Sequence, residues 1–146
     1  MDASAPIVIG FDGSATAAAA LRRGLDLAVR LQVPARVVRA WSVSNAPRPQ
    51  SWEPGYVPPI DDFADAVLTQ LRQQVEPVAA EFPDAQLSLE VPHGPAGREL
   101  VAAAESAQLI VVGDRGRGGL PELLLGSVSK EVVNHATCDV LVVRAH

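Results

Sequence analysis

The sequence has very little cysteine, lysine and aromatic character, and each shortage excludes a class of protein or site. Cys138 is the only cysteine in 146 residues, so no intrachain disulfide and no cysteine-cluster metal site can form. Lys130 is the only lysine, which rules out any mechanism that needs two. Aromatic residues make up 4% of the chain, so its 48% apolar content rests on Ala, Val and Leu. That composition favours helices packed on a sheet over an aromatic-rich β-sandwich.

Positive charge is also in short supply. Twelve basic side chains against seventeen acidic ones leave a net charge of −5, the wrong sign for a protein that binds nucleic acids or a membrane surface. The first apolar run, Ile7–Phe11, is too short for a signal peptide or a membrane span. We therefore expect a cytoplasmic protein with no nucleic acid and no membrane as partner, folded as a single domain over residues 1–146.

Five strand patterns alternate with four helix patterns along the chain. Ile7–Phe11 and Leu109–Gly113 are continuous apolar runs, as in central parallel strands covered on both faces, whereas the alternating Gln86–Val91 fits an edge strand. The remaining strands are predicted at Arg36–Trp41 and Val140–Val143. Helices are predicted from Ser14 to Leu31, from Asp61 onward with a kink at Pro77, from Pro95 to Ala107, and after Gly126 to Ala136. This alternation predicts a doubly wound α/β domain with a parallel sheet.

Between the second strand and the second helix, residues 42–60 form a long proline-rich segment. It contains Trp52 and Tyr56 among five prolines. Its length and composition predict an irregular surface excursion, which either shapes a ligand pocket or serves as a partner surface.

Polar, glycine-rich turns follow both predicted central strands. The first strand ends in Asp12-Gly13-Ser14, and the fourth leads into the spacing Gly113-x2-Gly116-x9-Gly126-Ser127. In open α/β sheets, ligands lie beyond the carboxyl ends of the strands, where the strand order reverses. Glycines allow the backbone to approach a bulky anion, and the free amides of a helix that begins after Gly126 attract negative charge. The second turn thus predicts a phosphate site.

Side chains around the two turns add to this interpretation. Ser127 and Ser129 supply hydroxyl donors, Arg115 and Arg117 supply positive charge, and Asp12 suits ribose hydroxyls. Together the turns predict a nucleoside phosphate lying across them. Spacing alone leaves a plain glycine loop equally open, and Asp12 can instead form an Asx-turn or a helix cap.

Other chemistry has less support in the sequence. His93, His135 and His146 are scattered and share no metal-ligand spacing. The P-loop pattern G-x-x-x-x-G-K-(S/T) is absent and no catalytic dyad stands out, so any ATP hydrolysis is expected to be slow. A phospho-receiver domain needs an acidic pair near the first strand, an aspartate after the third strand and a lysine after the fifth. Of these residues only Asp12 is in place.

These residues resemble the universal stress protein family over nearly the whole chain. The similarity rests on residues 7–14, on His93-Gly94-Pro95-Ala96 and above all on residues 110–144. The ATP-binding members of that family carry G-x2-G-x9-G-(S/T), which this chain meets in full. The resemblance implies a five-stranded parallel sheet ordered 3-2-1-4-5 with helices on both faces. It also implies an ATP-binding stress-response module with little or no turnover.

The resemblance further implies a set of ligand contacts. The turn Asp12, Gly13 and Ser14 corresponds to the ribose side, the backbone of Ala40 to the adenine-reading position, and Gly113 to the ribose wall. The phosphate positions are Gly116, Gly126, Ser127 and Val128, with Ser129 beside them and Arg115 as a side-chain clamp. Magnesium would be held through the phosphates. Some members bind cAMP, so a cyclic nucleotide is the alternative ligand and slow ATP hydrolysis the alternative activity.

The family usually dimerises through its last strand, and we therefore expect a homodimer through the apolar edge Val140–Val143. Two residues depart from the family pattern: Asp139 stands where relatives commonly carry proline, and Gln108 where many carry aspartate. Because neither lies at the expected nucleotide contacts, they bear on local packing and dimer geometry rather than on binding.

Overall fold

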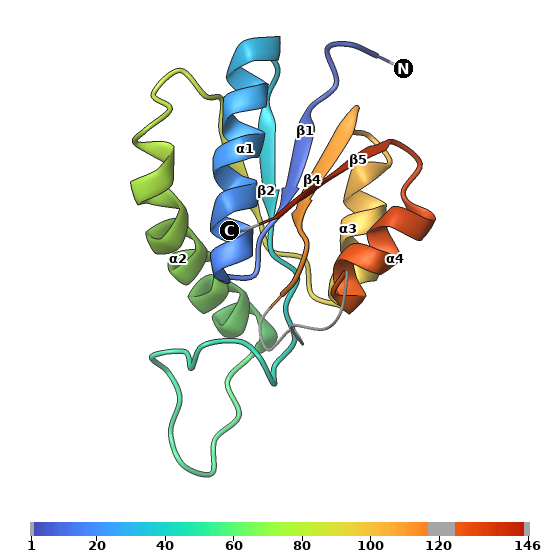
Figure 1. Cartoon of the computed structure of the whole chain (residues 1–146). Coiled ribbons are helices and arrows are strands. Elements are labelled where there is room, and N and C mark those ends of the chain that lie inside the picture. The colour runs from blue at the N-terminus through green and yellow to red at the C-terminus, as the bar shows by residue number, and fades with distance from the viewer. Residues whose placement is uncertain (1, 117–124, 145–146) are drawn as a thin grey trace.

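The sheet has the strand order expected from the sequence. The computed structural model describes residues 2–116 and 125–144 of the chain. Its five parallel strands form one sheet ordered β3-β2-β1-β4-β5 (Figure 1). The strands are β1 (Ile7–Gly10), β2 (Ala35–Val38), β3 (Leu87–Glu90), β4 (Leu109–Gly113) and β5 (Asp139–Val143). The order reverses between β1 and β4, whose carboxyl ends therefore lie side by side.

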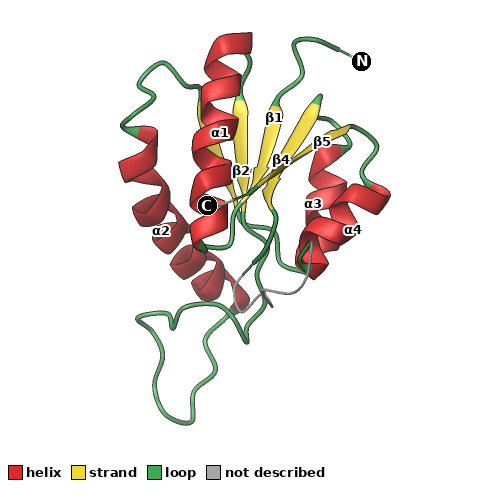
Figure 2. Cartoon of the chain, viewed as in Figure 1, coloured by secondary structure: helices red, strands yellow, loops and turns green. Residues whose placement is uncertain are grey.

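Helices cover both faces of the sheet, which confirms the doubly wound α/β class. They are α1 (Ala15–Leu31), α2 (Ile60–Ala79), α3 (Ala96–Ala104) and α4 (Ser127–His135). Figure 2 shows α1 and α2 on one face and α3 and α4 on the other. The side chains of β1 divide accordingly: Ile7 and Ile9 pack with α1 and α2, whereas Val8 packs with residues of α3 and α4.

Helix α1 begins where the serine of the first turn can cap it. The Ser14 hydroxyl oxygen accepts a hydrogen bond from the Ala17 amide at 3.1 Å, which satisfies one of the amides left open at a helix start. The helix ends at Gln32, whose φ of 55° is left-handed and whose amide donates to carbonyls of the last turn. Capping at both ends holds α1 at a defined position beside the carboxyl end of β1.

The edge strands differ from the central ones in burial. All four residues of β1 are buried, whereas β3 and β5 are only partly covered, as the alternating pattern of β3 led us to expect. Helix α2 includes Pro77 in its final turn and ends two residues later, at Ala79. None of the helices in the two described ranges is both long and apolar enough to cross a membrane.

Beyond its last residue, β2 continues as an irregular extension beside β3. Arg39 and Trp41 donate backbone hydrogen bonds to Glu90 and Pro92 at 2.9 and 3.1 Å, and Trp41 forms a parallel bridge with His93. The residues by which the predicted strands extend beyond β2 and β3, up to Trp41 and Val91, therefore lie where the two segments still pair, although less regularly than in the sheet. This extension places Ala40 at the carboxyl edge of the sheet, next to the end of β1.

Candidate functional site

A pocket opens at the carboxyl ends of β1 and β4, where the strand order reverses. It encloses about 500 Å³ between atoms, counting the part open to solvent. Its lining comes from the ends of β1, β2 and β4 and from the first turns of α1, α3 and α4. Segments far apart in the sequence thus meet at one position.

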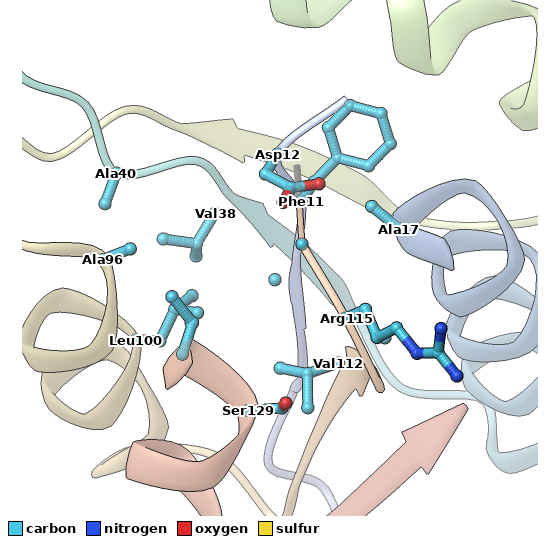
Figure 3. A pocket seen from close by; sticks show the side chains of 14 residues that line it. Phe11, Asp12, Ala17, Val38, Ala40, Ala96, Leu100, Val112, Arg115 and Ser129 are labelled. Carbon is cyan, nitrogen blue, oxygen red and sulfur yellow. The ribbon is translucent and has the colours of Figure 1, made fainter. Parts of the chain in front are cut away.

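One side of the pocket is apolar. Figure 3 shows Val38, Leu100 and Val112 facing a common space, with Ala40 and Ala96 at its border. Val38, Leu100 and Val112 come from three different elements, β2, α3 and β4. Such a wall suits a flat, weakly polar group such as a heterocyclic base.

The other side is polar and begins with Asp12. Its carboxylate Oδ1 accepts a hydrogen bond from the Ser14 amide at 2.9 Å, and Gly13 has a φ of 85°. This is the Asx-turn that the sequence left open as an alternative. Asp12 also lines the pocket, so the turn and the pocket wall share one residue.

Two glycines let other segments of the chain approach closely. Gly113 is approached by Thr16 of α1, and Gly116 by the side chain of Asp12. A Cβ on Gly113 would lie 2.8 Å from Thr16 Oγ1 and 2.9 Å from the Thr16 carbonyl carbon, so α1 and the end of β4 touch there. A Cβ on Gly116 would lie 2.8 Å from Asp12 Oδ2. The hydroxyl of Thr16 donates to the Arg115 carbonyl oxygen. The two turns named by the sequence are therefore in direct contact.

The start of α4 forms the rest of the polar side. The Gly126 amide donates to the Asp114 carbonyl at 2.7 Å, and the helix has no side-chain cap and no acidic residue in its first turn. The amides of Ser127, Val128 and Ser129 are the first three of the helix and have no carbonyl four residues earlier within it. A helix start in this state attracts anions.

The structure brings most of the predicted contact residues together. Those that line the pocket are Asp12, Ala40, Gly113, Arg115, Gly116, Val128 and Ser129. Gly13, Ser14, Gly126 and Ser127 belong to the adjoining turns without lining it. Arg117, expected to add charge, lies outside the described residues.

Two of these residues have roles that the sequence did not indicate. The Ser129 hydroxyl donates to the carbonyl oxygens of Asp114 and Gly126 at 3.1 Å, so it holds the loop to the helix. The guanidinium of Arg115 points away from Val38, Leu100 and Val112 in Figure 3, and it does not lie over the apolar wall. The role of Arg115 as a side-chain clamp on the phosphates therefore stays a prediction.

Charge at the polar side is mixed. The Asp114 side chain is 5% exposed, and its Oδ2 lies 3.9 Å from Arg115 Nε. Among the described residues, neither Asp114 Oδ1 nor Arg115 Nε, both buried, has a hydrogen-bond partner. Within the described parts of the chain, no group of three His, Cys, Asp or Glu side chains is arranged to hold a metal ion.

The sheet and pocket define a doubly wound α/β protein with a ligand site at the strand-order reversal. The comparison with known families is more specific. The chain belongs to the universal stress protein family, whose model matches residues 4–144. Two universal stress proteins of Mycobacterium tuberculosis are 34% and 36% identical to it over 143 residues. The alignments cover 96% of this chain but 44% and 45% of those relatives. The chain thus spans less than half of their length.

Solved structures show the same fold. The universal stress protein UspA from Lactobacillus plantarum superposes with a TM-score of 0.74 at 25% identity, covering 97% of this chain and 98% of the other. A universal stress protein in complex with cAMP gives 0.70 at 23% identity with the same coverage. One from Archaeoglobus fulgidus in complex with dAMP gives 0.63 at 20% identity, covering 95% and 97%.

Proposed function

We propose that the pocket binds an adenine nucleotide, ATP in particular, and that the protein is a regulatory module of the stress response. The observation that carries this proposal is the pairing of an apolar wall with an open helix start in one pocket at the strand-order reversal. Nucleotides combine a flat base with a charged tail, so this arrangement matches both ends of the ligand.

The proposed orientation follows from the two sides of the pocket. The adenine base lies against Val38 and Leu100, with its edge toward the backbone of Ala40. The ribose lies between Asp12 and Gly113, since an ionised carboxylate accepts hydrogen bonds from ribose hydroxyls. The phosphates extend past Gly116 to the amides at the start of α4.

We propose that magnesium, if bound, is held by the phosphates of the nucleotide rather than by a metal site of the protein. The described residues offer no cluster of three metal-ligating side chains. Magnesium commonly binds substrate phosphates with few protein ligands, so the ion would enter with the triphosphate.

Turnover is not part of the proposed role. Among the residues that line the described pocket there is no histidine and no lysine, and Asp12 already accepts the Ser14 amide. Fast hydrolysis needs a positioned water and stabilisation of the transition-state charge. We therefore propose a binding function in the cytoplasm, with slow hydrolysis at most.

A cyclic nucleotide is the second candidate. One structural neighbour is a universal stress protein in complex with cAMP, and another is in complex with dAMP. A cyclic nucleotide would use the same apolar wall and the same Asp12 turn. It would place less charge at the start of α4.

Calorimetric titration of the purified protein with ATP, AMP and cAMP tests the proposal, with thermal unfolding as a second readout. A ligand that binds the folded protein raises the melting temperature, and the shift grows with the logarithm of its free concentration relative to its Kd. We expect Ser127→Ala to weaken ATP binding by about 0.5–1.5 kcal/mol, the net value of one hydrogen bond. Ser88→Ala, on the exposed side of edge strand β3, is the matched control.

Absence of heat and of any melting shift at saturating ATP, AMP and cAMP would reject the proposed function. Unchanged ATP affinity in Ser127→Ala would remove that residue from the site and leave the pocket itself in place.

A further inference from the structure

The proline-rich segment 42–60 takes no part in the pocket at the ends of β1 and β4. None of its residues is among those that line that pocket. In Figure 1 the segment projects beyond the carboxyl end of the sheet, next to the start of α2 and away from β5. Of the two roles that the sequence left open for it, a ligand pocket or a partner surface, the structure favours the second.

Large apolar side chains are exposed along this segment. In the two described ranges, seven large hydrophobic side chains are exposed, and five of them lie between residues 43 and 60: Val43, Trp52, Tyr56, Val57 and Ile60. Four of the five fall within nine residues of sequence, and Val57 is 77% exposed. Exposed apolar side chains are ordinary when they are scattered, but a group of them marks a surface that another molecule covers.

The segment is held in a defined shape. A hydrogen bond from the Tyr56 amide to the Glu53 carbonyl at 3.0 Å closes a turn, and Gly55 has the left-handed φ of 79° that suits its third position. A Cβ on Gly55 would meet no atom within 4 Å, so the turn stands in open space. At the base of the segment, Ala46 packs against a buried cluster of the core. A surface that is fixed in advance loses little conformational entropy when a partner binds.

A groove runs between the segment and α2. Residues 47–51 form one wall, and the other is the face of α2 made by positions 62, 65, 66, 69, 70 and 73. The space between the walls amounts to about 1080 Å³, counting the part open to solvent. The Ser51 hydroxyl donates to Asp62 Oδ2 at 2.6 Å and joins the walls. Most of the lining side chains are polar, and amides such as those of Gln50 and Gln73 can both donate and accept hydrogen bonds, as an extended peptide backbone requires.

The charge of this surface indicates the kind of partner. Residues 42–66 carry four carboxylates and one guanidinium. The carboxylates are Glu53, Asp61, Asp62 and Asp65, and the guanidinium is that of Arg48. Such a surface attracts cationic groups and repels nucleic acids and anionic membranes. A second copy of the chain, with its net charge of −5, is also disfavoured by like charge.

The protein itself contains one contact of the favoured kind. The guanidinium carbon of Arg48, which lines the groove, lies 5.0 Å from the centroid of the Trp52 ring. Aromatic faces attract cations, and arginine stacks on them readily. The edge of the groove therefore combines a ring that accepts a cation with carboxylates on the opposite wall.

We propose that the groove between residues 47–51 and α2 docks an extended segment of another protein that carries basic and apolar side chains. Its basic side chains reach Asp62 and Asp65, and its apolar ones pack on Trp52 and on the turn at Tyr56. The proposal goes beyond the nucleotide function and does not depend on it, because the groove and the nucleotide pocket share no lining residue.

Fluorescence polarisation with labelled peptides of about ten residues tests the docking, since such a peptide is longer than the roughly 17 Å of α2 between Asp62 and Gln73. The probe alternates arginine with leucine. One comparison peptide carries glutamate for each arginine, and the other carries serine for each leucine. At about 0.15 M salt we expect the probe to bind at least about tenfold more tightly than either comparison peptide. A smaller difference from either one would overturn the proposal.

Variants of exposed side chains locate the binding without threatening the fold. Tyr56→Ala and Asp65→Asn should each weaken binding of the probe at least about fivefold. The matched controls are Leu31→Ala, at the end of α1, and Asp84→Asn, in the turn before β3, and both should bind the probe as the wild type does. Losses no larger than those of the controls would place the peptide elsewhere and overturn the proposal.

Two other occupants of the groove would give different results. With a second copy as occupant, Tyr56→Ala would lower the mass of the protein in light scattering. With a lipid surface as occupant, the wild type would sediment with phosphatidylcholine vesicles and Tyr56→Ala would not. Either result would overturn the docking of a basic segment, whereas unchanged mass and no sedimentation, together with the loss of probe binding, would support it.

Discussion

Thr16 joins the two turns that make up the polar side of the pocket. Its hydroxyl donates to the Arg115 carbonyl oxygen and lies 3.2 Å from the Ser14 hydroxyl. Its own atoms fill the space where Gly113 would carry a Cβ. One side chain of α1 therefore holds the loop after β4 in place.

Thr16→Val should lower the free energy of unfolding by about 1 kcal/mol, because it keeps the shape of the side chain and leaves the Arg115 carbonyl without its donor. Urea denaturation measures the change. Thr16→Ser keeps the hydroxyl and is the control. A valine variant as stable as the wild type would mean that the loop does not depend on this hydrogen bond.

Single residues could be assigned to the site where their chemistry is visible in the sequence. Asp12 and the glycine spacing from Gly113 were named because they follow the two predicted central strands, where ligands lie in open α/β sheets. Val38, Leu100 and Val112 were missed, because every strand and helix here carries such residues. Which of them face a pocket depends on the pairing of elements, although the positions of Val38 and Val112 near strand ends were an available signal.

Among the elements, β2, β3 and α3 are tied together by Arg36. Its guanidinium donates to both Glu90 carboxylate oxygens, at 2.6 and 2.8 Å. It also donates to the Ala103 carbonyl at 3.1 Å and to the Ser106 hydroxyl at 2.9 Å. This cluster connects the edge strand to the helix that provides Leu100 of the pocket.

Arg36→Met should destabilise the protein by no more than about 1 kcal/mol at pH 7, because the pair is partly exposed and screened by solvent. The hydrogen bond from Arg36 holds the pKa of Glu90 below its ordinary value of 4.5, against the opposing effect of burial. The stabilisation is therefore present above pH 4.5 and lost as the pH falls through the lowered pKa. Urea denaturation of both proteins at pH 7 and pH 3 should show the difference shrinking; a difference that grows in acid would contradict this account.

The type and order of the elements could be predicted, together with both ends of β4 and the last residue of α1, but several other ends could not. The third helix was expected to reach Ala107 and ends at Ala104. Glu105 and Ala107 donate instead to carbonyls three residues back, a tighter turn that leads into β4. An alanine-rich stretch gives no signal for that change. Gln108 also gained a role only in three dimensions, since its amide donates to the Ala3 and Ala5 carbonyls at 2.9 and 2.6 Å.

For the whole molecule, the open edge of β5 is the feature that bears on assembly. β5 pairs with β4 on one side and with no other strand of the described chain. Val140–Val143 are only partly buried. Apolar edge strands are usually covered, because their free backbone groups pair readily with another chain.

We propose that two copies of the chain pair through Val140–Val143. Light scattering after size-exclusion chromatography at micromolar concentration should give twice the chain mass of 15.3 kDa. Asp84→Asn, in the turn before β3, should leave that mass unchanged. A monomer at this concentration would reject the dimer without affecting the pocket.

The reversal of strand order between β1 and β4 has a consequence for synthesis on the ribosome. Residues 10–40 supply one part of the pocket wall and residues 96–129 the other. β1 cannot pair with β4 until about a hundred further residues have been translated. A growing polypeptide therefore lacks the complete binding surface until residue 129 has been made, and a ligand that uses both parts of the wall cannot stabilise it before then.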